Sequence, residues 1–265
     1  MTSPSVAEPG DQAAAGDGLT DDAFLGGRLR ILQPRKGYRA GIDPVLLAAA
    51  TPAQAGQSVL DLGTGAGTAI LCLAARVPGL DLAAVELQAD YADLARRNAA
   101  RNGIALDLHC ADLTRLPDAL RARQFDHVIM NPPYFAGASR TAAPDAGRET
   151  ALAGADLPLW ADTAIRRLAP GGTLAVIHDA AALPDLLGAL DSRVGGVAVH
   201  PLAPRQGRAA HRVIVSCRKG SRGAFRLLPP LVLHAGPSHA ADGEDYAPAI
   251  SAVLRDAAPL PGPEV

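Results

Sequence analysis

The sequence predicts an α/β fold in which helices cover both faces of a seven-stranded, mostly parallel sheet. The main observation is that short apolar stretches alternate with longer helical patterns from residue 58 onward, as in consecutive βαβ units. The second observation is that only the turn 204–210 separates the last two apolar stretches. Because so short a connection requires antiparallel pairing, we expect five parallel strands and a terminal antiparallel pair.

Residues typical of helix ends and turns set the bounds of these elements. Asp43 followed by Pro44 indicates an N-cap with proline at the first helical position. Asn102-Gly103 and the segment 169–172 are typical of helix ends. The predicted strands are 58–62, 82–86, 105–110, 125–130, 173–178, 197–202 and 211–217. The predicted helices begin at residue 43 and at residue 89, and span 68–77, 157–168 and 181–190.

The two ends of the chain differ from this core in composition. Residues 1–22 contain acids but no base, and we expect a disordered acidic tail, because such a segment buries too little apolar surface to fold. Residues 23–256 are predicted to form a single domain. Its parts are a basic segment with a helix at 23–57, the core at 58–218 and a C-terminal extension at 219–256. The Pro-rich residues 257–265 are expected to be loose.

Composition excludes several classes of protein. The three cysteines, Cys72, Cys110 and Cys217, lie far apart, without the spacing of a disulfide framework or a zinc site. The N-terminus lacks the pattern of a signal peptide, and no apolar run approaches the ~20 residues that span a bilayer. We therefore expect a cytoplasmic protein with no metal and no membrane association, and no obligate protein partner is evident.

A glycine-rich loop follows the first core strand. Gly63, Gly65 and Gly67 precede helix 68–77, where glycine lets the backbone turn tightly and approach a ligand. A dinucleotide-binding loop has its third glycine three residues after the second, and here that residue is Thr68. Asp61 beside the loop would repel a pyrophosphate but suits a ligand that carries an amine and a sulfonium. The loop therefore predicts S-adenosylmethionine as the cofactor.

Two further acids follow the next two strands. Glu86 ends strand 82–86, where its carboxylate can accept hydrogen bonds from both ribose hydroxyls of the cofactor. Asp112 follows strand 105–110 and can accept the adenine amino group, with capping of the next turn as the alternative. Neighbouring residues complete the expected cofactor site, namely Thr64, Leu87 and Leu113.

The tetrapeptide 131–134 follows the fourth core strand, at the same edge of the sheet. Pro132 and Pro133 fix φ and lack N–H groups, so the adjacent carbonyls are held rigidly. The Asn131 side-chain oxygen and the Pro132 carbonyl can accept both hydrogens of an exocyclic amine and turn its lone pair toward a methyl donor. Tyr134 offers a ring on which a planar target can stack. The tetrapeptide predicts an N-methylation site next to the cofactor, and the alternative is an Asn-Pro turn that ends a strand.

The glycine loop and this tetrapeptide resemble those of Rossmann-like class I methyltransferases that modify amino groups in nucleic acids or glutamine amides in proteins. Segments 36–47 and 218–234 narrow the resemblance to the bacterial family that N6-methylates adenosine 37, just 3′ of the anticodon, in valine tRNA. The resemblance covers roughly residues 24–234, and the acidic tail departs from it. It implies a methyltransferase domain, a tRNA substrate, and a place for Tyr38 and Asp43 near the methionine end of the cofactor.

Basic residues lie on both flanks of the predicted core. No acid occurs between residues 24 and 42 or between residues 192 and 241, although both stretches contain several arginines. The absence of compensating acids favours a surface that follows phosphates, and the alternative is ordinary solvation of charged residues. The residues expected to bind RNA are Arg35, Lys36, Arg39, Arg205, Arg208, Lys219 and Arg222.

The sequence therefore predicts an S-adenosylmethionine-dependent adenine-N6 methyltransferase that acts on RNA, with tRNA near the anticodon as its substrate. The first alternative is a glutamine N5-methyltransferase of release factors, a group that usually has a helical domain before the glycine loop. A DNA adenine methyltransferase has no visible target-recognition domain to support it. An NAD-dependent oxidoreductase is not supported, because the third glycine of the loop does not have the spacing of a dinucleotide-binding loop. The remaining alternative is a non-catalytic RNA-binding protein on the same scaffold.

Overall fold

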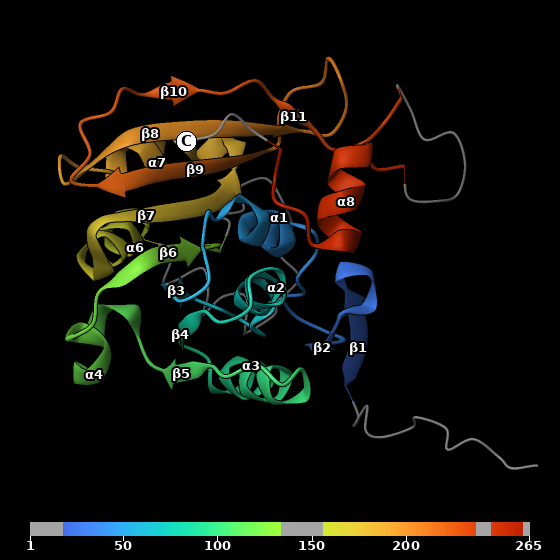
Figure 1. The fold of residues 1–265 in the computed structure, drawn as a ribbon, viewed down its shortest axis with the longest axis vertical. Coiled ribbons are helices and arrows are strands. Elements are labelled where there is room, and N and C mark those ends of the chain that lie inside the picture. The colour runs from blue at the N-terminus through green and yellow to red at the C-terminus, as the bar shows by residue number, and fades with distance from the viewer. Residues whose placement is uncertain (1–17, 134–155, 237–244, 262–265) are drawn as a thin grey trace, which may run out of the picture.

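The computed structural model of the 265-residue chain describes residues 18–133, 156–236 and 245–261. These residues form a large mixed sheet between two helical layers, with a small second sheet near the N-terminus (Figure 1). Within this described part, no helix is both long and apolar enough to cross a membrane.

The central strands are parallel and follow one another with helices in between. They are β3 (Ser58–Leu62), β4 (Asp81–Glu86), β5 (Asp107–Cys110), β6 (Phe125–Met130) and β7 (Leu168–Asp179). Their order across the sheet is β7-β6-β3-β4-β5, so the chain reverses its direction of travel across the sheet at β3. Open α/β sheets bind ligands at such a reversal, outside the carboxyl ends of the strands.

The sheet continues beyond β7 with an antiparallel strand. β9 (Arg212–Lys219) lies between β7 and β8 (Val194–Ala203) and is antiparallel to both, which confirms the predicted fold class. Two short strands, β10 (Arg226–Leu227) and β11 (Leu231–Val232), pair with β8 and extend this edge. They were not predicted, because two residues are too few to show an apolar period.

Helices cover the two faces of the sheet. Helices α1 (Asp43–Ala50), α2 (Thr68–Arg76), α3 (Ala89–Arg101) and α8 (Pro248–Asp256) lie on one face, and α4 (Asp118–Arg121), α6 (Leu157–Arg167) and α7 (Leu183–Ala189) on the other (Figure 1). Single 3-10 turns are η1 (Leu25–Gly27), η2 (Leu113–Arg115) and η3 (Ala180–Ala182). Successive strand residues alternate between two apolar cores: Val59 packs with Ile70 of α2, and Leu60 with Trp160 of α6.

The N-terminal boundary of the folded part differs from the prediction. Residues 19–22 belong to β1 (Leu19–Phe24), which pairs antiparallel with β2 (Leu29–Pro34), so the predicted disordered tail up to residue 22 is wrong at its end. Asp21 is ordered by ion pairs with Arg30 and Arg101, at 3.2 and 2.8 Å. Residues 1–17 of the predicted tail lie outside the described residues.

The C-terminal boundary also differs. The prediction of loose residues from 257 onward is wrong for Ala257 to Leu260, which pack against the core that α1 and α8 share. Ala257 is buried, and the Leu260 N–H donates to the Ala49 carbonyl at 3.0 Å. Residues 262–265 lie outside the described residues.

Candidate active site

Strand register brings the two predicted motifs to adjacent positions. Leu62 of β3 pairs with Met130 of β6, so the next residues of the two strands, Gly63 and Asn131, meet at the carboxyl edge of the sheet. The N–H groups of Gly63 and Thr64 both donate to the Val85 carbonyl, at 2.8 and 3.0 Å. These bonds turn the glycine loop back across the end of β4.

Two independent constraints require glycine in this loop. Gly63, Gly65 and Gly67 have φ values of +68°, +57° and +86°, in the left-handed region that favours glycine. In addition, a Cβ on Gly63 would lie 2.4 Å from Cη2 of the buried Trp160 ring. The first glycine therefore also makes room for the packing of α6, a requirement that the loop sequence does not reveal.

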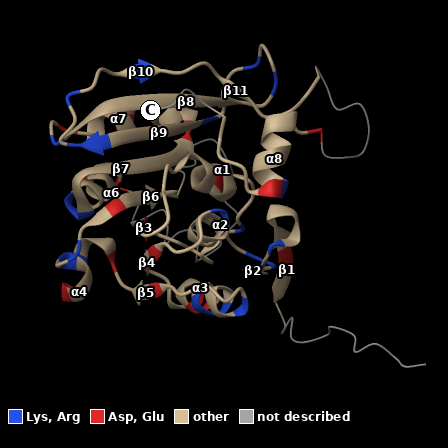
Figure 2. Ribbon diagram, in the orientation of Figure 1, with Lys and Arg blue, Asp and Glu red and all other residues tan. Residues whose placement is uncertain are grey.

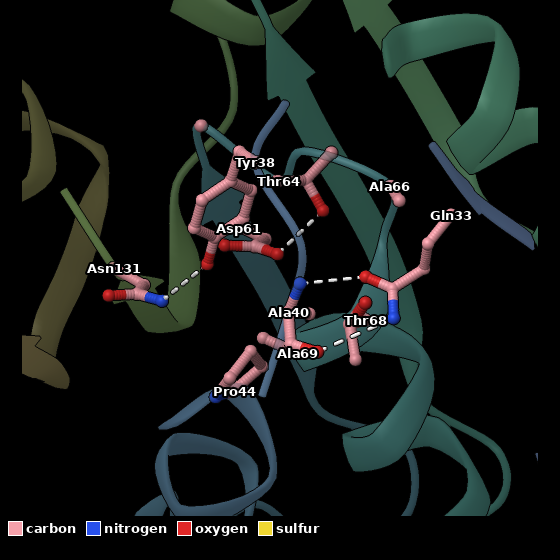
Figure 3. Close-up of a pocket in the computed structure, with 11 residues that line it drawn as sticks. Gln33, Tyr38, Ala40, Pro44, Asp61, Thr64, Ala66, Thr68, Ala69 and Asn131 are labelled. Atoms are coloured by element: carbon pink, nitrogen blue, oxygen red, sulfur yellow. Dashed lines mark hydrogen bonds between the residues drawn. The ribbon is translucent and has the colours of Figure 1, made fainter. Parts of the chain in front are cut away.

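A cavity of about 420 Å³, open to solvent, lies beside the loop (Figure 3). Predicted site residues that line it are Tyr38, Asp61, Gly63, Thr64 and Asn131. The other lining residues are Gln33, Ala40, Pro44, Ala66, Thr68 and Ala69.

Two buried carboxylates lie under the glycine loop. Asp61 Oδ2 accepts from the Thr64 hydroxyl at 2.6 Å. Burial raises the pKa of Asp61 to about 7; the bond from Thr64 opposes the rise and the neighbouring Glu86 carboxylate adds to it. Glu86 accepts from the N–H groups of Gly65 and Gln88, both at 2.9 Å, and burial raises its pKa too.

This electrostatic environment favours a cationic ligand. Among the described residues, neither Asp61 nor Glu86 has an ion-pair partner, so a bound cation would relieve the cost of burying two carboxylates. The buried Thr68 hydroxyl, at the first turn of α2, lines the cavity and has no hydrogen-bond partner within the described part of the chain. A ligand with a positive charge and polar groups, such as S-adenosylmethionine, fits these requirements.

Tyr38 forms a wall of the cavity beside the glycine loop, where a Cβ on Gly65 would lie 3.8 Å from its ring. Its hydroxyl accepts from Asn131 Nδ2 at 3.3 Å (Figure 3). Burial of this hydroxyl, together with the nearby Asp43 and Asp61 carboxylates, raises the pKa of Tyr38 to about 12. Tyr38 therefore lies next to Asn131 in the cavity wall, and its place near the methionine end of the cofactor stays a prediction.

Other predicted cofactor residues lie outside this cavity. Asp43 is the first residue of α1, with Ile42 as the N-cap, and its carboxylate pairs with Arg212 at 3.1 Å, so the predicted capping role is wrong. Asp112 accepts from the Thr114 N–H at 2.8 Å, which is the capping alternative, and its contact with adenine stays a prediction. Leu87 is half exposed beyond Glu86, and Leu113 begins η2.

The tetrapeptide is described up to Pro133. Asn131 and Pro133 are half-buried and Pro132 is buried, whereas Tyr134 lies outside the described residues, so its stacking role stays a prediction. No group of three or more His, Cys, Asp or Glu side chains that could hold a metal ion occurs in the described ranges.

The predicted RNA-binding residues divide into three groups. Arg35 and Lys36 are exposed in the loop before Tyr38, and Arg208 is exposed on the hairpin after β8, at the carboxyl edge of the sheet. Lys219 and Arg222 lie at the opposite edge, where the ribbon is blue at the end of β9 (Figure 2). The Lys219 ammonium donates to the Leu168 carbonyl at 2.6 Å.

The third group is already engaged within the protein. Arg205 is buried, pairs with Asp245 and donates to the Ala235 and Gly236 carbonyls, so its prediction as a phosphate contact is wrong. Arg39 pairs with Asp22 at 2.9 Å.

Sequence reasoning missed the residues that support the cavity from behind. Asn98 of α3 is fully buried; its Oδ1 accepts from the Leu32 N–H at 2.7 Å, and its Nδ2 donates to the carbonyls of Leu32 and Ala66 at 3.0 and 2.9 Å. It thus joins β2 to the glycine loop. An asparagine on the buried face of an amphipathic helix was the available signal, since a buried amide needs partners.

The Rossmann-like sheet, the glycine loop over two buried carboxylates and the adjacent Asn131 define a class I S-adenosylmethionine-dependent methyltransferase. Comparison with known proteins agrees with this class. The family model described as "Methyltransferase small domain" matches residues 41–194. A tRNA1(Val) (adenine(37)-N6)-methyltransferase from Aeromonas hydrophila is 34% identical over 194 residues, which are 70% of this chain and 79% of that protein.

Other relatives and solved structures extend the comparison. An equally named protein from Bacteroides fragilis is 33% identical over 115 residues, 43% of this chain and 47% of that protein, so the match spans about half of that relative's length. A structure described as a predicted O-methyltransferase from Agrobacterium tumefaciens is 29% identical, with a TM-score of 0.65, and the match covers 80% of this chain and 94% of that one. The 16S rRNA N2 G1207 methyltransferase of Thermus thermophilus, with a TM-score of 0.54 and 18% identity over 76% of this chain and 50% of that one, shares the fold.

The chain belongs to the methyltransferase small domain family and, within it, to the family of the tRNA1(Val) (adenine(37)-N6)-methyltransferases.

Proposed function

We propose that this protein transfers the methyl group of S-adenosylmethionine to the N6 amine of an adenosine in tRNA, beside the anticodon. The observation that carries the proposal is that Asn131 lines the same cavity as Asp61 and the glycine loop. An acceptor for an amine is thus next to the residues suited to a cationic cofactor. The names of the relatives support the choice of tRNA and of the N6 position.

The cofactor, when bound, supplies an electrophilic methyl group, and the protein supplies position. The Asn131 side-chain oxygen and the Pro132 carbonyl would accept the two hydrogens of the amine, so that its lone pair is directed out of the ring plane. Such placement can provide several of the ~7–11 kcal/mol available from proximity and orientation. The methylated amine is acidic and loses its extra proton to solvent, so the reaction needs no strong general base.

Exposed cations at the carboxyl edge of the sheet support an RNA substrate. Arg35 and Lys36 precede Tyr38 directly, and among the described residues neither makes an ion pair. Arg208 lies on the hairpin at the same edge. These side chains would bind phosphates while a loop base swings into the cavity, which costs little when the base is unpaired.

Incubation of the enzyme with labelled S-adenosylmethionine, bulk tRNA and a release factor tests the proposal. We expect label in the tRNA fraction. Label confined to the protein fraction would indicate the glutamine methyltransferase alternative, and label in neither would contradict both.

A further inference from the structure

Asn131 can act as an acceptor only if its carboxamide has one particular orientation. The two ends of the group have nearly the same shape, but one accepts hydrogen bonds and the other donates them. A rotation of half a turn would present an NH₂ group to the NH₂ group of the substrate, and two donors cannot bond to each other. Something in the site must therefore fix this rotation.

We propose that Tyr38 is a positioning residue whose hydroxyl fixes the orientation of the Asn131 carboxamide. Asn131 Nδ2 donates to this hydroxyl at 3.3 Å, and the carboxamide oxygen points away from the Tyr38 ring (Figure 3). With its nitrogen held by Tyr38, the carboxamide turns its oxygen to the other side, where it would accept from the substrate amine. The inference rests on the proposed function, because it assigns Tyr38 a role that only an amine substrate requires.

The backbone of Tyr38 is itself held from two sides. The hydroxyl of Tyr91 on α3 accepts from the Tyr38 N–H at 2.9 Å and donates to the Tyr38 carbonyl at 3.1 Å. Two residues further on, the Gln33 side chain accepts from the Ala40 N–H at 2.7 Å and donates to the Ala40 carbonyl at 3.4 Å. Side chains from α3 and β2 thus replace the backbone partners that this loop lacks.

Gln33 is in turn fixed by a charge. It is buried, and its Nε2 donates to Asp22 Oδ2 at 2.7 Å, which determines which end of this second amide is the donor. The same Asp22 oxygen accepts from Arg39 at 2.9 Å. A series of oriented groups therefore runs from β1 through Gln33 and the loop 38–40 to Asn131.

The chemistry of the Tyr38 hydroxyl suits this task. The phenolic oxygen has lone pairs that can accept from the Asn131 NH₂ group, as the contact at 3.3 Å shows. Phenylalanine would keep the ring and remove the acceptor.

A double-mutant cycle with Tyr38→Phe and Asn131→Ala tests the inference on tRNA under single-turnover conditions with excess enzyme. Tyr38→Phe should lower the rate of methyl transfer about tenfold, the size expected for one lost hydrogen bond, with S-adenosylmethionine affinity by calorimetry unchanged within about twofold. In the Asn131→Ala background the same substitution should have almost no further effect, because Tyr38 acts through Asn131.

Thr68→Val is the matched control, since it also removes a hydroxyl from the cavity wall but from a residue that does not contact Asn131 in the described structure. Its effect should be equal in both backgrounds. A Tyr38→Phe variant with the rate of the unmodified enzyme, or one whose effect is equally large without Asn131, would overturn the inference.

A readout without substrate separates this inference from the proposed function. The side-chain amide resonances of Asn131 should shift in Tyr38→Phe, whereas Thr68→Val should leave them in place. If the unmodified enzyme methylates no tRNA, the proposed function fails; if it does so and neither rate nor resonance responds to Tyr38→Phe, only the positioning role fails.

Discussion

The Tyr91 hydroxyl bonds to both backbone groups of Tyr38, accepting from its N–H at 2.9 Å and donating to its carbonyl at 3.1 Å. A side chain of α3 thereby fixes the wall of the cofactor cavity, although the two residues are far apart in sequence. The Tyr91 hydroxyl thus satisfies both backbone groups of Tyr38, as a neighbouring strand would.

Tyr91→Phe should loosen this wall. We expect the Tyr38 amide to exchange its hydrogen at least about fivefold faster, because the substitution removes two hydrogen bonds, each worth ~0.5–1.5 kcal/mol of local stability. The overall unfolding midpoint should change little, since the contact lies at the surface. Hydrogen exchange followed by NMR measures this directly, and unchanged protection of Tyr38 would show that the bond does not hold the loop.

Asn98 is expected to be far more important for stability. Asn98→Ala leaves three buried backbone groups without their side-chain partner, and we expect a loss of ~3 kcal/mol in the free energy of unfolding. Asn102→Ala is the matched control: Asn102, the C-cap residue directly after α3, makes the corresponding contacts with Arg30 at an exposed site, so ~1 kcal/mol is expected. Urea unfolding of both variants gives the comparison, and equal losses would contradict it.

The elements that could be predicted are those whose signal is local. The strands β3 to β9 show apolar runs with turn residues at their ends, and the glycine loop and Asn131 follow two of these strands directly. The strand β1 could not be predicted, because its polar residues are ordered by Gln33 and by arginines from elsewhere in the chain.

The charged surface shows the same limit. Arginines in a segment without acids can still pair with acids from other parts of the chain. Arg205 pairs with Asp245 and Arg39 with Asp22, and both aspartates lie outside the acid-free segments. The contact between Asn131 and Tyr38 likewise depends on how the loop 35–42 folds back over the sheet edge. Sequence spacing carries no information about such contacts.

Cofactor affinity should depend on pH through Asp61. Its raised pKa of about 7 means that the carboxyl is mostly neutral at about pH 6 and mostly ionised at about pH 7.5. A cationic ligand prefers the ionised form, so S-adenosylmethionine affinity should rise by nearly tenfold over this interval. Calorimetry should show this slope in the unmodified enzyme and a weak, flat dependence in Asp61→Asn. Equal slopes in the two proteins would remove Asp61 as the cause.

RNA affinity should fall steeply as salt is added, because each phosphate contact releases counterions. Replacing Arg35 and Lys36 with Gln should flatten the slope of log K against log salt by about 1.5, at ~0.7–0.9 per contact. The sequence also predicts an RNA contact for Arg222, which lies at the opposite edge of the sheet; Arg222→Gln should change the slope little if the RNA lies on the carboxyl edge. If Arg222→Gln flattened the slope and the replacement of Arg35 and Lys36 did not, the RNA would lie on the edge of the sheet opposite to the cavity.

The central claim is that Asn131 places an adenine amine for methylation, and mass spectrometry of nucleosides from treated tRNA tests it most directly. The unmodified enzyme should produce N6-methyladenosine beside the anticodon. Asn131→Ala should produce it about 10²- to 10³-fold more slowly, the cost of one lost polar positioning group, with cofactor affinity kept within a few-fold. A methyl group found on a ribose or ring carbon, or an Asn131→Ala enzyme as fast as the unmodified one, would contradict the account.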